Sequence, residues 1–375
     1  MKEKICLVVA SPMTVSAFLQ QPIRRLSERY DVHVALNIRP GESLAGVENL
    51  VTVLPVSIER KIMPWRDLMA LWQIFVLFRR HRFKLVHSVT PKAGLLAMLA
   101  AFLAGIDIRV HTFTGQVWVT RRGLARLILK NMDKLIARFG TYALVDSPSQ
   151  RQFLLDEGVL SEAKSGVLAE GSISGVDTMR FQPDDLARKR LRAELKISGE
   201  EVVFLFLGRL NRDKGVPDLA AAFAALNDER AHLLLVGPDE ENITAQVMQL
   251  TEECKDRVHF VGYAAKPEEY MAAADVLCLP SYREGFGSVV IEAAAVGIPA
   301  IGTRIYGVVD AIQEDVSGVL FGARDISGLQ AAMRHMVNNR EYRLQLGQQA
   351  RTRAIKTFSS DRLSAAWLAF YQARV

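Results

Sequence analysis

The stretch from Ser281 to Gly302 constrains this chain most, because it reads as a strand end, a glycine turn, a short apolar helix and a second strand. The run Leu277–Pro280 supplies the first strand. Gly285 and Gly287 let the backbone turn tightly and approach a ligand, since neither carries a Cβ. We expect Ser288 to cap the helix that follows, and the free N–H groups at the helix start to form an anion site.

Two carboxylates bracket this turn, Glu284 and Glu292, eight positions apart. A capping box would need Val289 as the cap for Glu292 to be its partner, and valine is a poor cap. We therefore expect another partner for Glu292, about one helical turn from the anion site, where an acid suits ribose or sugar hydroxyls. Taken alone, these residues also fit a buried βα turn with two surface acids.

Length and composition predict two α/β domains. The chain has 375 residues, half of them hydrophobic, and apolar strand-like runs alternate with helical patterns, as in parallel sheets. Positions 1–180 carry 24 basic and 15 acidic residues, a net charge of +9, and the remaining positions carry 23 and 26, a net charge of −3. The first half is therefore expected to bind an anionic partner. Three scattered cysteines are typical of a reduced cytosolic protein without structural zinc.

Two further segments carry patterns that bear on the fold and the site. Gly208–Gly215 (GRLNRDKG) comes directly after the apolar run Val202–Leu207 and carries Arg209 and Lys214. Gly171–Pro183 (GSISGVDTMRFQP) connects the two expected domains and is interpreted as a hinge region.

Together these segments resemble the retaining glycosyltransferases of family 4 (group 1), in particular bacterial enzymes that build O-antigen and capsule repeat units. The shared patterns are the E-x7-E motif at 284–292, G-R-L-x-x-x-K-G at 208–215 and the G-V-D…F-x-P connection at 175–183. The resemblance implies the GT-B fold, with two Rossmann-like doubly wound domains facing a central cleft. Residues 1–180 would form the acceptor-side domain and 181–359 the nucleotide-sugar domain, with the terminal helix 360–375 packing back on the first.

The resemblance also implies roles for site residues. Arg209 and Lys214 would hold the donor diphosphate, where fixed cations stabilise the charge that develops on the leaving group. The other implied donor contacts are Gly237 near the nucleoside, Tyr263 beside the base, Glu284 with Gly285, Phe286, Gly287 and Ser288 at the sugar and nearby phosphate, and Glu292 at the ribose. The alternative for Arg209 and Lys214 is an exposed basic loop.

His111 is a doubtful candidate for the catalytic side. In the wider family a histidine often precedes the glycine that corresponds to Gly115, but this chain has Thr114 there. If the strand continues, His111 and Thr114 point to opposite faces. A structural histidine is the alternative.

The implied reaction transfers a sugar, with retention, from a nucleotide sugar to a polyprenyl-diphosphate-linked saccharide in surface polysaccharide biosynthesis. The expected donor is a UDP-sugar, with an N-acetylhexosamine as a candidate. Neither D-x-D nor a P-loop motif is present, so no metal requirement and no cofactor are expected. The alternatives are a non-hydrolysing sugar-nucleotide epimerase of the same fold and a basic, noncatalytic scaffold or nucleic-acid-binding protein.

A membrane surface is the expected anionic partner of the first half. In the expected helix 121–139, Arg126, Lys130, Lys134 and Arg138 recur every four positions and share one face. Aromatic residues are dense between Trp65 and Phe78. These features indicate a cytoplasmic protein that lies peripherally on the anionic inner face of the membrane. A solvated outer face is the alternative, and nucleic acid is not expected because no recognised binding motif accompanies the charge.

Overall fold

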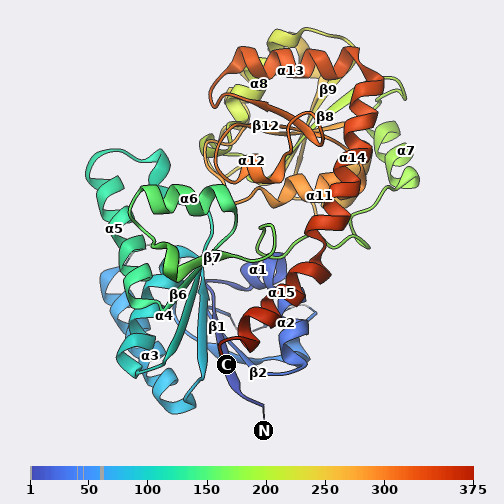
Figure 1. Cartoon of the computed structure of the whole chain (residues 1–375). Coiled ribbons are helices and arrows are strands. Elements are labelled where there is room, and N and C mark those ends of the chain that lie inside the picture. The colour runs from blue at the N-terminus through green and yellow to red at the C-terminus, as the bar shows by residue number, and fades with distance from the viewer. Residues whose placement is uncertain (1, 40, 45, 60–62) are drawn as a thin grey trace. The chain divides into compact units, whose positions relative to one another are not determined.

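The computed structural model describes residues 2–39, 41–44, 46–59 and 63–375 and divides the chain into two units (Figure 1). Unit 1 runs up to Gly175 and takes in Ser360–Val375, and unit 2 comprises Val176–Ser359. The chain therefore passes from one unit to the other twice. The first passage lies between Gly175 and Val176, within the expected hinge region Gly171–Pro183, whereas the expected domain boundary is residue 180.

Within its described residues, unit 1 builds a parallel sheet of seven strands in the order β3-β2-β1-β4-β5-β6-β7. The interior strand β1 is buried from Ile5 to Val8, as expected for a strand covered on both sides. Strand order reverses between β1 and β4, which are direct neighbours. The strands are β1 (Lys4–Val8), β2 (Asp31–Leu36), β3 (Thr52–Pro55), β4 (Leu85–Val89), β5 (Ile108–Phe113), β6 (Tyr142–Val145) and β7 (Ser165–Val167).

Helices cover both faces of this sheet. Buried residues of α3, α4, α5 and α6 share one core cluster, and buried residues of η1, α2 and α15 share the other. The helices are α1 (Pro12–Thr14), the π-helical turn η1 (Val15–Leu19), α2 (Gln20–Ser27), α3 (Pro64–His81), α4 (Pro91–Ala104), α5 (Gly123–Phe139), α6 (Pro148–Asp156) and α15 (Ser360–Gln372), with 3₁₀ turns η2 (Glu48–Leu50), η3 (Val117–Thr120) and η4 (Glu162–Lys164).

The terminal helix α15 belongs to unit 1 through buried aromatic and polar contacts. The indole N–H of Trp367 donates to the Ile173 carbonyl at 3.0 Å. The Tyr371 hydroxyl lies 2.8 Å from Nδ1 of His87, whose Nε2 lies 2.7 Å from the Thr112 hydroxyl. A helix at the end of the chain thus completes the core of a unit formed mainly by the first half.

Unit 2 has a parallel sheet of six strands within its described residues, in the order β10-β9-β8-β11-β12-β13. Its strand order reverses between β8 and β11, again between direct neighbours. In such sheets ligands bind beyond the carboxyl ends of the strands at this reversal. The strands are β8 (Val202–Leu207), β9 (Ala231–Val236), β10 (Val258–Gly262), β11 (Val276–Leu279), β12 (Ala300–Thr303) and β13 (Gly318–Phe321).

Helices also cover both faces of the second sheet. Helices α8, α9 and α13 contribute to one core cluster, and α7, α10, α11 and α12 contribute to the other. The helices are α7 (Asp185–Glu194), α8 (Val216–Leu226), α9 (Thr244–Leu250), α10 (Pro267–Ala273), α11 (Ser288–Val296), α12 (Val308–Ala311), α13 (Ile326–Asn338) and α14 (Arg340–Phe358), with 3₁₀ turns η5 (Arg212–Lys214) and η6 (Glu252–Arg257). The predicted α/β class with two doubly wound parallel sheets is confirmed.

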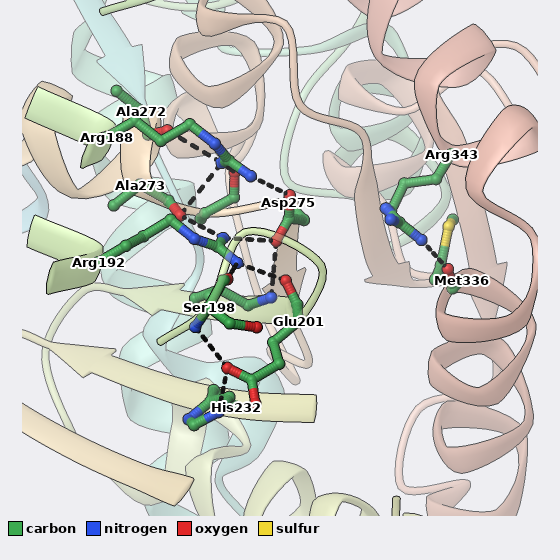
Figure 2. A network of polar contacts seen from close by, with 12 residues as sticks. Arg188, Arg192, Ser198, Glu201, His232, Ala272, Ala273, Asp275, Met336 and Arg343 are labelled. Atoms are coloured by element: carbon green, nitrogen blue, oxygen red, sulfur yellow. Dashed lines mark hydrogen bonds and ion pairs between the residues drawn. The ribbon is translucent and has the colours of Figure 1, made fainter. Parts of the chain in front are cut away.

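An ion-pair network fastens α7 to the amino edge of this sheet. Figure 2 shows Arg188 and Arg192 of α7 pointing toward Asp275, which directly precedes β11. The Asp275 carboxylate accepts from Arg188 at 2.7 Å and from Arg192 at 3.0 Å. It also accepts the backbone N–H of Val203 at 2.8 Å. Because this network lies at the amino edge, it is separate from the loops where a ligand is expected.

Candidate active site

Glycines bring four loops of unit 2 into backbone contact at the carboxyl edge of the sheet. A Cβ added to Gly215, after β8, would lie 2.1 Å from the Pro280 carbonyl oxygen, after β11. A Cβ on Gly237, after β9, would lie 1.8 Å from the Gly208 carbonyl oxygen. All three glycines at such contacts, including Gly307 after β12, have positive φ. Only glycine allows the loops to come this close.

Lys214 and Glu284 meet at the centre of these loops. Their side chains form an ion pair, although they are 70 residues apart in sequence. Lys214 ends the turn η5, which begins after Asn211, whose side chain accepts the Lys214 backbone N–H at 3.1 Å. Glu284 also accepts from the Ser281 hydroxyl at 2.8 Å. The structure therefore fixes both members of a pair that the sequence patterns place on separate loops.

Two neighbours of Glu284 reinforce the same junction. The Tyr282 hydroxyl donates to Asp218 at 2.7 Å, and Arg283 donates to Asp213 at 2.9 Å. Burial, together with the hydrogen bond to Asp218, raises the pKa of Tyr282 to about 12. These contacts join the loops after β8 and β11. No sequence motif predicts them, since their partners lie on a separate helix and turn.

Arg209 pairs with an acid from the loop after β9. Its Nη1 lies 2.8 Å from a carboxylate oxygen of Glu240, and its side chain is 44% exposed. Arg209 and Lys214 thus each contact a carboxylate, and both lie on the loop that follows β8. Glu240 is absent from the residues singled out in the sequence.

The start of helix α11 differs from the prediction. Gly287, with φ of 84°, is the N-cap residue, and Ser288 is the first helical residue. No side-chain cap hydrogen bond is formed there, so the prediction that Ser288 caps the helix is wrong. The left-handed glycine makes the turn into the helix in place of a capping hydroxyl. N–H groups of the first turn thus have no side-chain cap as a partner.

The side chain of Phe286 lies in the core of unit 2. Its ring is 2% exposed and packs edge-on against the ring of Phe358, with centroids 5.2 Å apart. The side chain therefore belongs to the core, which leaves the backbone of Phe286 for the implied donor contact, and that contact stays a prediction. The packing of the ring holds Gly285 and Gly287 in place on either side.

Glu292 lies half-buried in the second turn of α11. Burial raises the pKa of its carboxyl to about 7; nearby Arg180 acts in the opposite direction, and Glu268 adds to the rise. Arg180 and Glu268 themselves form an ion pair at 2.8 Å. The side chain is therefore near the midpoint of its titration at neutral pH.

The residues implied for the nucleoside lie on adjoining loops. The Gly237 N–H donates to the Gly262 carbonyl at 2.7 Å, which ties the loop after β9 to the end of β10. Tyr263 follows directly and is 78% exposed. Arg209, Lys214, Gly237, Tyr263, Glu284 and Glu292 all belong to unit 2.

His111 of unit 1 lies in the core. It is 2% exposed, and its Nδ1 lies 2.8 Å from the Ser88 hydroxyl. The ring covers Gly94 of α4 so closely that an added Cβ there would lie 2.4 Å from Cε1. Burial lowers the pKa of His111 to about 3, so the ring is neutral at physiological pH. These facts match the structural histidine that the sequence left open.

The described residues contain neither a candidate metal centre nor a candidate membrane span. In that part of the chain, no three His, Cys, Asp or Glu side chains are grouped as metal ligands. No helix there combines the length and the apolar composition that a bilayer span requires.

Two doubly wound parallel sheets within one chain define the GT-B class of fold. The structure of Anabaena HepE in complex with UDP superposes with a TM-score of 0.82 and 18% identity, covering 100% of both chains. The family model "Glycosyl transferase 4-like domain" matches residues 14–164, in unit 1, and "Glycosyl transferases group 1" matches residues 187–353, in unit 2. The chain belongs to the group 1 glycosyltransferases and is a transferase enzyme.

Curated relatives of known activity cover most of the chain. The capsular polysaccharide biosynthesis glycosyltransferase CapM of Staphylococcus aureus is 28% identical over 88% of this chain and 87% of its own length. The UDP-Gal:alpha-D-GlcNAc-diphosphoundecaprenol alpha-1,3-galactosyltransferase of Escherichia coli is 26% identical over 71% of this chain and 70% of its own length. The predicted family and enzyme class are confirmed.

Proposed function

We propose that this glycosyltransferase moves a sugar from a UDP-sugar to a saccharide carried on a polyprenyl diphosphate, with retention at the anomeric carbon and without a metal ion. The E. coli relative is described as acting with UDP-Gal on a diphosphoundecaprenol-linked acceptor, and HepE binds UDP. These descriptions support the donor and acceptor classes. The observation that carries the proposal is the pair of cations, Arg209 and Lys214, on the loop beyond β8 at the strand-order reversal.

The donor diphosphate would bind Arg209, Lys214 and the start of α11. As the bond from the anomeric carbon to the phosphate oxygen breaks, negative charge grows on the leaving diphosphate. Two fixed cations and the N–H groups of a helix start stabilise that charge where it develops. The acceptor oxygen bonds to the same face of the anomeric carbon, and its proton passes to the departing phosphate oxygen. No side chain is assigned as a nucleophile.

The two acids of the E-x7-E motif would bind different groups of the donor. Glu284, held by Lys214 and Ser281, would accept hydroxyl groups of the transferred sugar. Glu292, one turn further along α11, would accept the ribose hydroxyls. Gly285 and Gly287 would let the backbone approach the sugar and phosphate without a Cβ in the way.

Alanine substitutions at the cations test the proposal. Arg209→Ala and Lys214→Ala should each lower kcat/KM for transfer by about 10²-fold or more, because each removes a charge that acts on the leaving group. Lys255→Ala is the matched control, since Lys255 is exposed and pairs only with its near neighbour Glu252 among the ion pairs of the described residues. Turnover near the wild-type level in both site variants would refute the assignment.

Donor and metal requirements are separate measurements. A true donor should raise the melting temperature by mass action, so a thermal-shift panel of UDP-, GDP- and TDP-sugars identifies the base. Transfer measured in excess EDTA should equal transfer with added Mg²⁺. A loss in EDTA that Mg²⁺ restores would overturn the metal-independent part of the proposal alone.

The proposed membrane contact rests on exposed apolar side chains of unit 1. Helix α4 lies between α3 and α5 on one face of the sheet (Figure 1), and the outer sides of these helices form a surface that we call the α3–α5 face. Trp65 and Trp72 on α3 are 79% and 63% exposed. Further exposed apolar residues on this face are Leu68, Met69, Val76, Phe102, Leu103, Leu124, Leu127, Ile128 and Leu135.

Basic residues accompany this apolar surface. Arg126 and Lys130 of the expected basic stripe on α5 both form ion pairs with Glu157. These two cations are therefore partly neutralised by an acid of the same unit. Lys134 and Arg138 are exposed. Aromatic side chains that enter the interface and cations beside them are the features of a surface that binds anionic lipid. We therefore place the enzyme peripherally on the anionic cytoplasmic leaflet.

Liposome flotation decides this part of the proposal. The wild-type protein should float with vesicles containing phosphatidylglycerol and bind pure phosphatidylcholine less. The double variant Trp65→Ala/Trp72→Ala should bind about tenfold more weakly, because two large apolar side chains no longer enter the interface. Met248→Ala, at an exposed apolar residue of unit 2, is the control. Equal, negligible binding to both vesicle types would exclude the contact.

A further inference from the structure

The loop after β9 is built onto the loop that carries Arg209. Leu210 and Asp239 form a parallel bridge beyond the ends of β8 and β9. The Leu210 N–H donates to the Pro238 carbonyl at 2.8 Å, and the Glu240 N–H donates to the Leu210 carbonyl at 3.2 Å. The backbone of Glu240 is therefore bonded to the residue next to Arg209.

The side chain of Asp239 makes this loop rigid. Its carboxylate accepts the backbone N–H groups of Ile243 and Thr244, each at 3.0 Å, and the Thr244 hydroxyl at 2.7 Å. An aspartate that holds the backbone of its own turn in this way fixes the turn's conformation. Glu240 thus projects from a fixed point.

The Glu240 carboxylate holds one edge of the Arg209 guanidinium. It accepts from Arg209 Nη1 at 2.8 Å and from Asn211 Nδ2 at 3.4 Å. A guanidinium has five N–H donors in a planar fork, so a contact at one nitrogen orients the plane and leaves further donors for another anion. A single carboxylate contact could not orient the ammonium group of Lys214 in this way, because an ammonium group is a point charge.

We propose that Glu240 is a positioning residue for donor binding, which acts by orienting the guanidinium of Arg209 toward the donor diphosphate. The inference rests on the proposed diphosphate role of Arg209. Electrostatics alone would give Glu240 the opposite role, because a carboxylate near a diphosphate repels it. The two roles predict opposite changes when Glu240 is removed. Removal of a positioning residue weakens donor binding, whereas removal of a competing counter-ion strengthens it.

The test compares Glu240→Ala, Glu240→Gln and Glu241→Ala. Glu240→Ala should raise the donor KM about tenfold with a smaller change in kcat, because the guanidinium loses a charge-assisted hydrogen bond that orients it. Glu240→Gln keeps an oxygen acceptor and should recover most of the loss. Glu241→Ala is the matched control, since the Glu241 carboxylate accepts the Arg212 backbone N–H at 3.1 Å and forms no ion pair with Arg209 in the described structure. Melting temperatures identify any variant that is merely misfolded.

A double-mutant cycle separates positioning from a structural role. In the Arg209→Ala background, Glu240→Ala should leave the donor KM unchanged, because the group through which it acts is gone. A full tenfold rise in that background, an unchanged KM in the single variant, or a lower KM would each overturn the inference. If Arg209→Ala itself transfers at the wild-type rate, the proposed diphosphate role fails first, whatever Glu240 does.

Discussion

Two clusters of ion pairs in unit 2 use the same side-chain types in different surroundings. The first, around Asp275, lies at the amino edge of the sheet (Figure 2). The second, around Lys214 and Arg209, lies on the loops of the carboxyl edge. Arginine or lysine meets carboxylate in both, so the chemistry of the pair alone does not separate structure from function.

Burial and the use of donors separate the two clusters. Arg192 has a side chain that is 6% exposed, and besides Asp275 it donates to three backbone carbonyls, those of Ser198, Glu201 and Ala273. Arg188 donates to three further carbonyls, in the segment 272–274. Arg209, by contrast, is 44% exposed, and its contact to Glu240 involves a single nitrogen. A cation with donors left over can bind a ligand, and one enclosed by backbone carbonyls cannot.

The largest effect is expected at the enclosed cluster. Asp275→Ala leaves Arg192 buried without its counter-ion, so the free energy of unfolding of unit 2 should fall by about 4 kcal/mol. All four tryptophans lie in unit 1, so amide hydrogen exchange in β8 and β11 under increasing urea is the measurement for unit 2. Glu252→Ala, in an exposed pair, should cost less than about 1 kcal/mol. Equal losses in the two variants would remove the distinction between the clusters.

Glu284→Gln should lower the activity of the enzyme while leaving its stability almost unchanged. The glutamine keeps the volume but loses the charge proposed to act on the sugar and on Lys214, so kcat/KM should fall by about 10²-fold, or about 3 kcal/mol in transition-state energy. The melting temperature should change little, since partly exposed pairs contribute little to stability. Steady-state transfer rates and thermal unfolding of the same preparations give both values. A stability loss with normal turnover would assign this cluster to structure as well.

The sequence patterns locate the loops of the second cluster but not all their contacts. Glycines with flanking strands and helices predict the turn at 285–287 and the proximity of Lys214 and Glu284, because carboxyl ends of parallel strands share one edge. The predicted capping role of Ser288 is wrong for a physical reason, and the burial of the Phe286 ring could not be predicted from the sequence. A positive φ at Gly287 places the helix start one residue earlier than a serine cap requires, and an aromatic ring beside a glycine turn can face the core as readily as a ligand.

The partners of single charges are harder to predict. Glu240 lies 31 positions from Arg209, and Asp275 lies 83 positions from Arg192. Neither pair has a periodic pattern, because each depends on how two loops or a loop and a helix come together in three dimensions. A sequence shows which residues can be charged, whereas the sheet order decides which of them meet.

A smaller effect is expected from the pH dependence of Glu292. Burial raises the pKa of its carboxyl from 4.5 to about 7, so between these pH values the folded protein holds a proton that the unfolded chain releases. Stability from this group therefore falls as the pH rises from 4.5 to 7 and stays low above 7. The change in pKa corresponds to about 3 kcal/mol, which the partial exposure of the side chain reduces by solvent screening. Glu292→Gln lacks this loss, so it should match the wild type in unfolding free energy near pH 4.5 and exceed it by about 2 kcal/mol at pH 8. A difference that is constant with pH would contradict the raised pKa.

The smallest effect tests whether a buried polar cluster without charge behaves like the Asp275 network. His87 of unit 1 has Tyr371 on one ring nitrogen and Thr112 on the other, and burial lowers its pKa to about 3, so it is neutral. Tyr371→Phe leaves one nitrogen of a buried ring without a partner, which should cost about 1 kcal/mol of unfolding free energy and leave kcat unchanged. Thr112→Val should cost a similar amount at the other nitrogen. Trp367 stacks on the His87 ring with centroids 4.7 Å apart, so tryptophan fluorescence in urea reports this region directly. A loss as large as that of Asp275→Ala would mean that hydrogen-bond satisfaction, rather than charge, sets the cost of breaking a buried polar cluster in this enzyme.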